Sequence, residues 1–298
     1  MKLLRAATLT VADLDRSIAL YRDWLDHRLI EHGALDGTLA ASWGAPKAAG
    51  ARTAVLEPAS GAEIFLRLVE QPPHPDFVPL KSYGWAAIEI CVQDVLATDA
   101  RLKDSPFKVI GPPREIDGLP AIYPMQVMGP DNEVVYLTQI RDDMPAFDLP
   151  RAQAPIDRMF IYVLACSDME ASQRFTVEKL GLALGRERME IVYTMLANAF
   201  GMPHERLHAI STVIHGRDVF LELDQMPPQA GPRPQHAGML PPGVAMASIT
   251  LPDFDARTAQ WADWLIAPPA HQASAVYGGK RAATFRGPDG ALFEVTEA

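Results

Sequence analysis

One pattern occurs four times along the 298-residue chain. Each copy is an apolar strand-like run, an aspartate, and then a stretch with helical spacing of apolar residues. The four copies read LRAATLTVADLDRS, WAAIEICVQDVLAT, MFIYVLACSDMEAS and VAMASITLPDFDAR, with the aspartates Asp13, Asp94, Asp168 and Asp253. By subtraction, the spacings between these aspartates are 81, 74 and 85 residues. Such a repeat limits the fold to an architecture of four similar units.

Each unit is predicted to contain one helix and four strands. The aspartate is a suitable helix N-cap, because its carboxylate accepts from the first free helix amides. After Asp13, Leu14, Ile18 and Tyr21 follow at helical steps, as in a helix that packs on a sheet. Strand-like runs come next, and units two and four close with the hairpin signals GPDNEVVYLTQI and GPDGALFEVTEA. The sequence therefore predicts an α+β protein made of βαβββ modules.

Two proline-rich segments indicate boundaries. Residues 144–155 (MPAFDLPRAQAP) are predicted to link two halves, 1–144 and 155–298. Residues 225–242 contain six prolines between the third and fourth units. Because proline cannot enter the middle of a sheet, this stretch is either a stiff crossover or a flap over a site.

Composition excludes several classes of protein. The hydrophobic share is 48% and the charged share 21%, close to the globular average. A net charge of −10 argues against a nucleic-acid partner, which needs a cationic face. No run of 18 apolar residues predicts a membrane span. Cys91 and Cys166 lie in apolar runs and give neither a disulfide framework nor a zinc site, so a reducing cytoplasm is the expected location.

The four units resemble the vicinal oxygen chelate superfamily, which includes glyoxalase I, bleomycin-resistance proteins and the extradiol dioxygenases. The resemblance rests on the strand–Asp–helix order and the closing GPDN and GPDG hairpins, and it covers nearly the whole chain. It implies four βαβββ modules paired into two half-barrel, cup-shaped domains. Residues 1–144 would form a vestigial N-terminal cup, and residues 155–298 the active C-terminal cup. It also implies a metal held by a first-strand histidine and a last-strand glutamate.

Counting from the four aspartates locates these ligand positions. The last-strand positions hold Arg67, Tyr136, Glu222 and Glu294. The first-strand positions hold Ala6, Ala87, Arg158 and Met246. Both expected imidazoles are therefore missing, whereas a divalent transition metal needs about three protein ligands. We expect no catalytic metal and no other cofactor; if this is wrong, the metal would be held by Glu222 and Glu294.

The candidate catalytic residues are Glu294, Glu222 and His208. The two glutamates would converge in the C-terminal cup, where mutual repulsion and burial raise one carboxyl pKa and an arginine lowers the other. The resemblance places His208 on the strand that carries an acid–base histidine in extradiol dioxygenases. The candidate substrate-binding residues are Arg158, Met246, Tyr136 and Arg67. The alternatives are a structural salt bridge, a structural histidine and simple core packing.

Three functions remain open from the sequence. The first is metal-independent proton transfer on a small aromatic or carbonyl compound, by a lyase, isomerase or hydratase. The second is a ligand-binding protein of the bleomycin-resistance type, and the third is a metal-dependent extradiol dioxygenase. All three imply a small-molecule partner. The sequence leaves open whether the chain forms a homo-oligomer.

Overall fold

The computed structural model describes residues 3–298 and contains the four predicted units. Unit one consists of β1 (Leu4–Val11), α1 (Leu14–Trp24), β2 (His27–Ala34), α2 (Gly37–Ser42), β3 (Arg52–Pro58) and β4 (Phe65–Glu70). Unit two consists of β5 (Gly84–Val92), α3 (Val95–Leu102), β6 (Lys108–Gly111), β7 (Ile122–Met128) and β8 (Val134–Ile140).

The second half of the chain repeats the same order. Unit three consists of β9 (Ile156–Cys166), α4 (Met169–Arg174), β10 (Ala183–Val192), α5 (Thr194–Phe200), β11 (Leu207–His215) and β12 (Asp218–Gln225). Unit four consists of β13 (Val244–Leu251), α6 (Phe254–Gln260), β14 (Ala270–His271), β15 (Arg281–Arg286) and β16 (Leu292–Glu297). A π-helical turn at Phe175–Lys179 extends α4, and 3-10 turns lie at Pro46–Ala48 and Pro288–Gly290.

Three of the four predicted aspartate caps are confirmed. The carboxylate of Asp13 accepts from the amide of Arg16, that of Asp94 from Leu96 and Ala97, and that of Asp168 from Ala171, at 2.9–3.0 Å. The fourth prediction is wrong, because Asp253 makes no side-chain bond to α6. Its backbone has φ −98° and ψ 43° instead of the extended conformation of the other three caps, which turns the carboxylate away from the helix amides.

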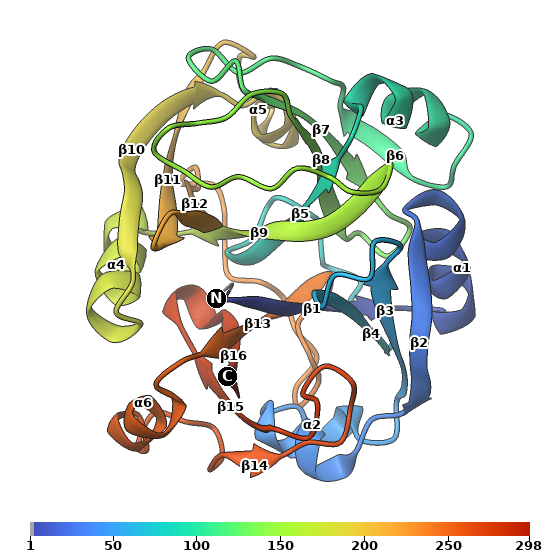
Figure 1. Ribbon diagram of the computed structural model, residues 1–298, viewed down its shortest axis with the longest axis vertical. Coiled ribbons are helices and arrows are strands. Elements are labelled where there is room, and N and C mark those ends of the chain that lie inside the picture. Colours follow the sequence, from blue (N-terminus) through green and yellow to red (C-terminus); the bar gives the residue numbers. More distant parts are fainter. Residues whose placement is uncertain (1–2) are drawn as a thin grey trace.

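The strands form two eight-stranded sheets (Figure 1). One has the order β14-β15-β16-β13-β1-β4-β3-β2 and combines units one and four. Because these are the first and last units along the chain, we call this sheet the outer sheet and its concave side the outer cup. The other has the order β10-β11-β12-β9-β5-β8-β7-β6 and combines units two and three; its concave side is the inner cup. The α+β fold of four βαβββ modules in two half-barrels is therefore confirmed.

The predicted pairing of consecutive units is wrong. Residues 1–144 supply half of each sheet, and so do residues 155–298, because the chain crosses from one sheet to the other twice. The crossovers, residues 71–83 and 226–243, lie side by side: Ser82 forms a bridge with Gly231, and the Tyr83 hydroxyl donates to the Ala230 carbonyl at 2.6 Å. The proline-rich stretch is thus one of two crossovers fixed against each other.

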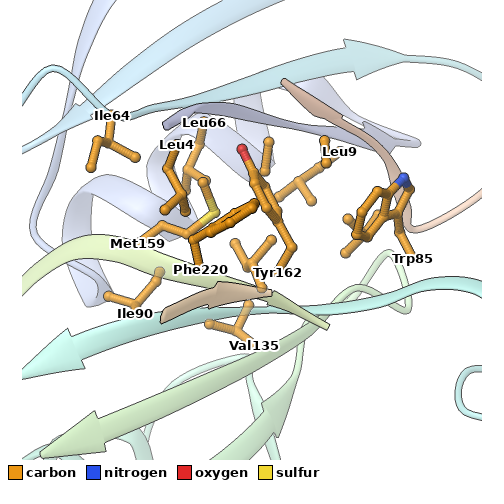
Figure 2. Packing of buried hydrophobic residues seen from close by; sticks show 14 of the residues in the cluster. Leu4, Leu9, Ile64, Leu66, Trp85, Ile90, Val135, Met159, Tyr162 and Phe220 are labelled. Atoms are coloured by element: carbon orange, nitrogen blue, oxygen red, sulfur yellow. The ribbon is translucent and has the colours of Figure 1, made fainter. Parts of the chain in front are cut away.

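The main hydrophobic core lies between the backs of the two sheets (Figure 2). It combines Leu4, Leu9 and Leu66 of the outer sheet with Tyr162 and Phe220 of the inner sheet. The Tyr162 hydroxyl lies 2.7 Å from the carbonyl oxygen of residue 6 and 2.8 Å from that of residue 248, which fixes β9 against β1 and β13. Both cups therefore face away from this shared core. Among residues 3–298, no helix has the length and apolarity needed to cross a membrane.

Candidate functional site

A buried ion pair occupies the base of the outer cup. Arg67 on β4 and Glu294 on β16 meet at 2.7 Å between Nη2 and Oε2, with side chains 3% and 0% exposed. Thr8 on β1 accepts from Arg67 Nε at 3.1 Å, and Ser248 on β13 donates to Glu294 Oε2 at 2.5 Å. These four residues come from the four central strands of the sheet, so the pair joins units one and four.

Two aromatic side chains close the outer cup over this pair. Trp43 donates to Glu294 Oε1 at 2.8 Å, and its ring lies 4.5 Å from the Arg67 guanidinium carbon. The Tyr277 hydroxyl donates to the same Glu294 oxygen at 2.7 Å. Burial acts to raise the pKa of Glu294, but the charge of Arg67 and the hydrogen bonds from Ser248 and Tyr277 outweigh it and hold the pKa below its usual value.

The outer cup does not fit a metal ion. The last-strand carboxylate that would bind the metal is already fully hydrogen-bonded, and the Arg67 guanidinium beside it would repel a cation. Met246, predicted to contact substrate, is fully buried and pairs with Thr8. The base of the outer cup is therefore occupied by its own side chains, and a cavity of about 430 Å³ lined by Arg67 and Val55 lies beside it.

The inner cup places acidic and aromatic side chains on one face of its sheet. Residues in register on neighbouring strands share a face. Glu89 on β5 is in register with Tyr136 on β8, which is in register with Gln126 on β7. On the other side of the cup, Glu222 on β12 is in register with Thr212 on β11. All five side chains line a single pocket.

The pocket has a volume of about 90 Å³ and largely apolar walls, which include Phe147, Phe160, Ile161, Met189 and Ile210. An apolar cavity of about 150 Å³ accommodates benzene. A ligand that fits entirely inside this pocket therefore has few heavy atoms, and a larger ligand extends out of the mouth of the pocket. The base, in contrast, holds the carboxyl groups of Glu89 and Glu222.

Three acidic groups at this base have raised pKa values. Burial and the nearby Glu222 raise the pKa of Glu89 to about 8. Burial, the charge of Asp224 and a hydrogen bond with it raise the pKa of Glu222 well above its usual value. Burial raises the pKa of Asp224 to about 7, while hydrogen-bonding contact with Glu222 and Tyr193 limits the rise. The base of the inner cup thus holds protons at neutral pH.

Two tyrosines complete the base of the inner cup. The hydroxyls of Tyr136 and Tyr193, just before α5, are hydrogen-bonded to each other, and both residues line the pocket. His208 on β11 packs edge-on against Tyr193, with ring centroids 6.4 Å apart, but it is not among the residues that line the pocket. Its Nε2 atom is buried without a hydrogen-bond partner among residues 3–298, and burial lowers its pKa.

Two predictions about the site are wrong. Glu222 and Glu294 do not converge, because β12 and β16 belong to different sheets. Arg158 does not face Glu222 either. The register places Val163 beside Glu222 and Ile161 opposite Glu89, so these residues of the long strand β9, and not Arg158, are the neighbours of the two glutamates. Arg158 lies 3.5 Å from Asp157, outside the lining of the pocket.

The structure regroups the remaining predicted residues. Arg67 and Glu294 meet in the outer cup, whereas Tyr136 and Glu222 meet in the inner cup. Sequence reasoning missed Glu89, Asp224 and Tyr193. The first two left a signal, because Glu89 interrupts the apolar run AAIEICV and Asp224 follows Glu222 by two positions on one strand face. Tyr193 left none.

The inner cup does not fit the metal of the superfamily either. Its lining offers carboxyl and phenol oxygens without an imidazole, and burial raises the pKa values of Glu89, Glu222 and Asp224, which favours the neutral carboxyl over the carboxylate that a metal ion needs. No group of three His, Cys, Asp or Glu side chains in the described part of the chain is arranged to hold an ion.

The fold is that of the vicinal oxygen chelate superfamily. Glyoxalase I from Zea mays superposes with a TM-score of 0.64 at 17% identity, over 100% of this chain and 92% of that one. A point variant of the same enzyme gives 0.66 at 17% identity, covering 99% and 94%. A proposed dioxygenase from Bacillus subtilis gives 0.63 at 12% identity, covering 99% and 84%. No protein-family model and no curated protein matches the sequence.

Proposed function

We propose that the inner cup binds a small carbonyl or aromatic compound and transfers a proton to or from it without a metal ion. The observation that carries this proposal is the pair of carboxyls, Glu89 and Glu222, at the base of an apolar pocket. A buried acid with a pKa near or above neutrality is suited to donate a proton to a bound ligand.

The two sides of the base have different roles in this proposal. Glu89, with a pKa of about 8, is protonated at neutral pH and donates to an oxygen of the ligand. Glu222 and Asp224 share a proton, and the pair accepts a proton from the adjacent carbon of the ligand. This combination is that of an isomerase or lyase. The hydroxyl pair of Tyr136 and Tyr193 positions the ligand oxygen by hydrogen bonding.

Deuterium exchange tests the proposal without knowledge of the natural substrate. Butanone, 2-oxobutanoate and acetophenone would each be incubated with the protein in D₂O, and loss of the C–H signal next to the carbonyl followed by NMR. We expect exchange above the buffer rate for at least one probe, and a loss of about 100-fold in E222Q. E190Q is the matched control, because Glu190 is an exposed glutamate that pairs with Arg188.

Two results would contradict the proposal. One is that none of the three probes exchanges faster than in buffer. The other is that E222Q exchanges as fast as the unaltered protein. Elemental analysis of the same sample shows whether any observed exchange coincides with a bound metal.

A further inference from the structure

The pocket of the inner cup has one cationic side chain in its lining, Arg186 on β10. Its position follows from two irregularities in the pairing of β10 with β11. The register shifts between Leu184 and Arg186 and again between Arg186 and Met189. As a result Arg186 pairs with Thr212 and Met189 with Ile210, and all four side chains line the pocket. The bulged strand therefore directs an arginine into the cup.

Arg186 has no acidic partner within the described residues. Within residues 3–298 its guanidinium forms no ion pair, and its nearest recorded side-chain contact is the ring of Phe147, 5.9 Å from Cζ to the centroid. Its neighbour Arg188, in contrast, pairs with Glu190 at 2.7 Å, and Arg217 pairs with Asp148 at 2.8 Å. An unpaired guanidinium over an aromatic ring keeps its donors free for a ligand.

The position of Arg186 relative to the acids sets the length of a ligand. Arg186, Thr212 and Glu222 occupy one row across three strands. Because neighbouring strands lie about 4.8 Å apart, the backbones of Arg186 and Glu222 are roughly 10 Å apart. Arg186 is exposed, whereas Glu89 is buried. A ligand that reaches both ends therefore has its charged group near solvent and its reacting group in the apolar interior.

We propose that the inner cup is specific for small monocarboxylates, with the ligand carboxylate held by Arg186 at the mouth and its carbonyl or aromatic end facing Glu89 and Glu222. This inference rests on the proposed function, since it concerns the same pocket. A guanidinium binds a carboxylate through two parallel hydrogen bonds. A single cation matches a monoanion, and the apolar walls between the two ends match an uncharged middle part.

Matched probe pairs test this specificity directly. Binding of 4-oxopentanoate and 4-oxopentanamide, and of benzoate and benzamide, would be measured by calorimetry with the full chain. We expect at least one acid to bind about tenfold more tightly than its amide, and R186Q to remove that preference while the amide affinity stays unchanged. R188Q is the control, because Arg188 lies on the same strand and outside the pocket, and we expect it to keep the preference.

Equal affinity of acid and amide, no binding by any of the four probes, or a preference that survives in R186Q would overturn the inference. The deuterium-exchange experiment separates this failure from that of the proposed function. Carboxylate binding lost in R186Q without any exchange would contradict proton transfer alone. Exchange of butanone that is unchanged in R186Q, with no acid preference, would contradict carboxylate specificity alone.

Discussion

Arg67 and Glu294 form an ion pair across the outer cup, at 2.7 Å and almost without exposure. Both occupy last-strand positions, one in the first unit and the other in the fourth. Their contact is possible because units one and four form one sheet. The pair occupies the position where the superfamily resemblance implies a metal, and it supplies its own positive charge through Arg67.

Removing Arg67 alone should destabilise the fold strongly. In R67M, Glu294 would remain buried and charged without its cation, a change that costs about 3–5 kcal/mol in the free energy of unfolding. The double variant R67M/E294Q removes both charges and should recover part of this loss. Urea unfolding at neutral pH measures both effects.

The pair of Arg28 and Glu57 provides the control for this prediction. It joins β2 to β3 at 2.9 Å, but the Arg28 side chain is 58% exposed. R28M should change the free energy of unfolding by less than about 1 kcal/mol. If R67M were no less stable than R28M, the buried pair would not contribute as described.

Local patterns in the sequence predicted the four units but not which units share a sheet. The aspartate caps at Asp13, Asp94 and Asp168 depend on residues within one turn, so the sequence pattern was sufficient to locate them. The pairing of β1 with β13 joins residues about 240 positions apart. It depends on the path of the two crossovers, for which no local signal exists.

The same distinction applies to the candidate site. Glu222 was predicted from its register with the third aspartate, because that count runs along a single unit. Its neighbours in the structure, Glu89 and Tyr136, come from unit two. The sequence pattern places Tyr136 in a separate N-terminal cup and does not single out Glu89. The prediction of a Glu222–Glu294 pair failed for the same reason, since it required the wrong units to share a sheet.

The crossed pairing predicts that the N-terminal half does not fold alone. Residues 1–144 contain β1 and β5 without their neighbours β13 and β9, so both strands would expose unpaired edges. We expect this fragment by itself to be unfolded or self-associated. Mixed with residues 145–298, it should form a one-to-one complex with the circular dichroism spectrum of the intact chain.

A fragment of similar length serves as the control. Residues 84–225 contain the whole inner sheet in one piece and should unfold more cooperatively than residues 1–144. Light scattering and urea unfolding compare the two fragments. A monomeric residues 1–144 fragment with a sharp transition would mean that consecutive units can also pair with each other.

Glu89 should make the protein less stable as the pH rises. Its pKa is raised to about 8 by burial and by Glu222, from an ordinary value of 4.5. The folded state therefore favours the protonated form. This contribution is fully present below about pH 4.5 and is lost as the pH rises towards 8, by at most about 1.4 kcal/mol per pH unit.

The variant E89Q isolates this effect, because glutamine stays neutral and can still accept the hydrogen bond from Thr138. Urea unfolding between about pH 5 and pH 8 should show a smaller loss of stability in E89Q than in the unaltered protein. E190Q changes an exposed glutamate and should leave the pH dependence unaltered. Parallel curves for E89Q and the unaltered protein would mean that Glu89 is ionised throughout this range.

Tyr136 and Tyr193 should behave as one energetic unit. Their hydroxyls are hydrogen-bonded to each other between β8 and the start of α5, and both side chains are buried. Y136F or Y193F alone leaves one buried hydroxyl without this partner, which costs about 1–3 kcal/mol. Once the first hydroxyl is lost, removal of the second should cost less, so the double variant is expected to fall short of the sum by about 1 kcal/mol.

Urea unfolding of the two single variants and the double variant measures this coupling. Y123F is the control, because the half-buried Tyr123 packs against Arg141 and its hydroxyl has no recorded hydrogen bond within residues 3–298. Strict additivity of Y136F and Y193F would show that the two hydroxyls act independently. A coupling of the expected size would mean that α5 is held to the base of the inner cup by this contact, so that loosening either tyrosine also disturbs the wall of the pocket above Glu222.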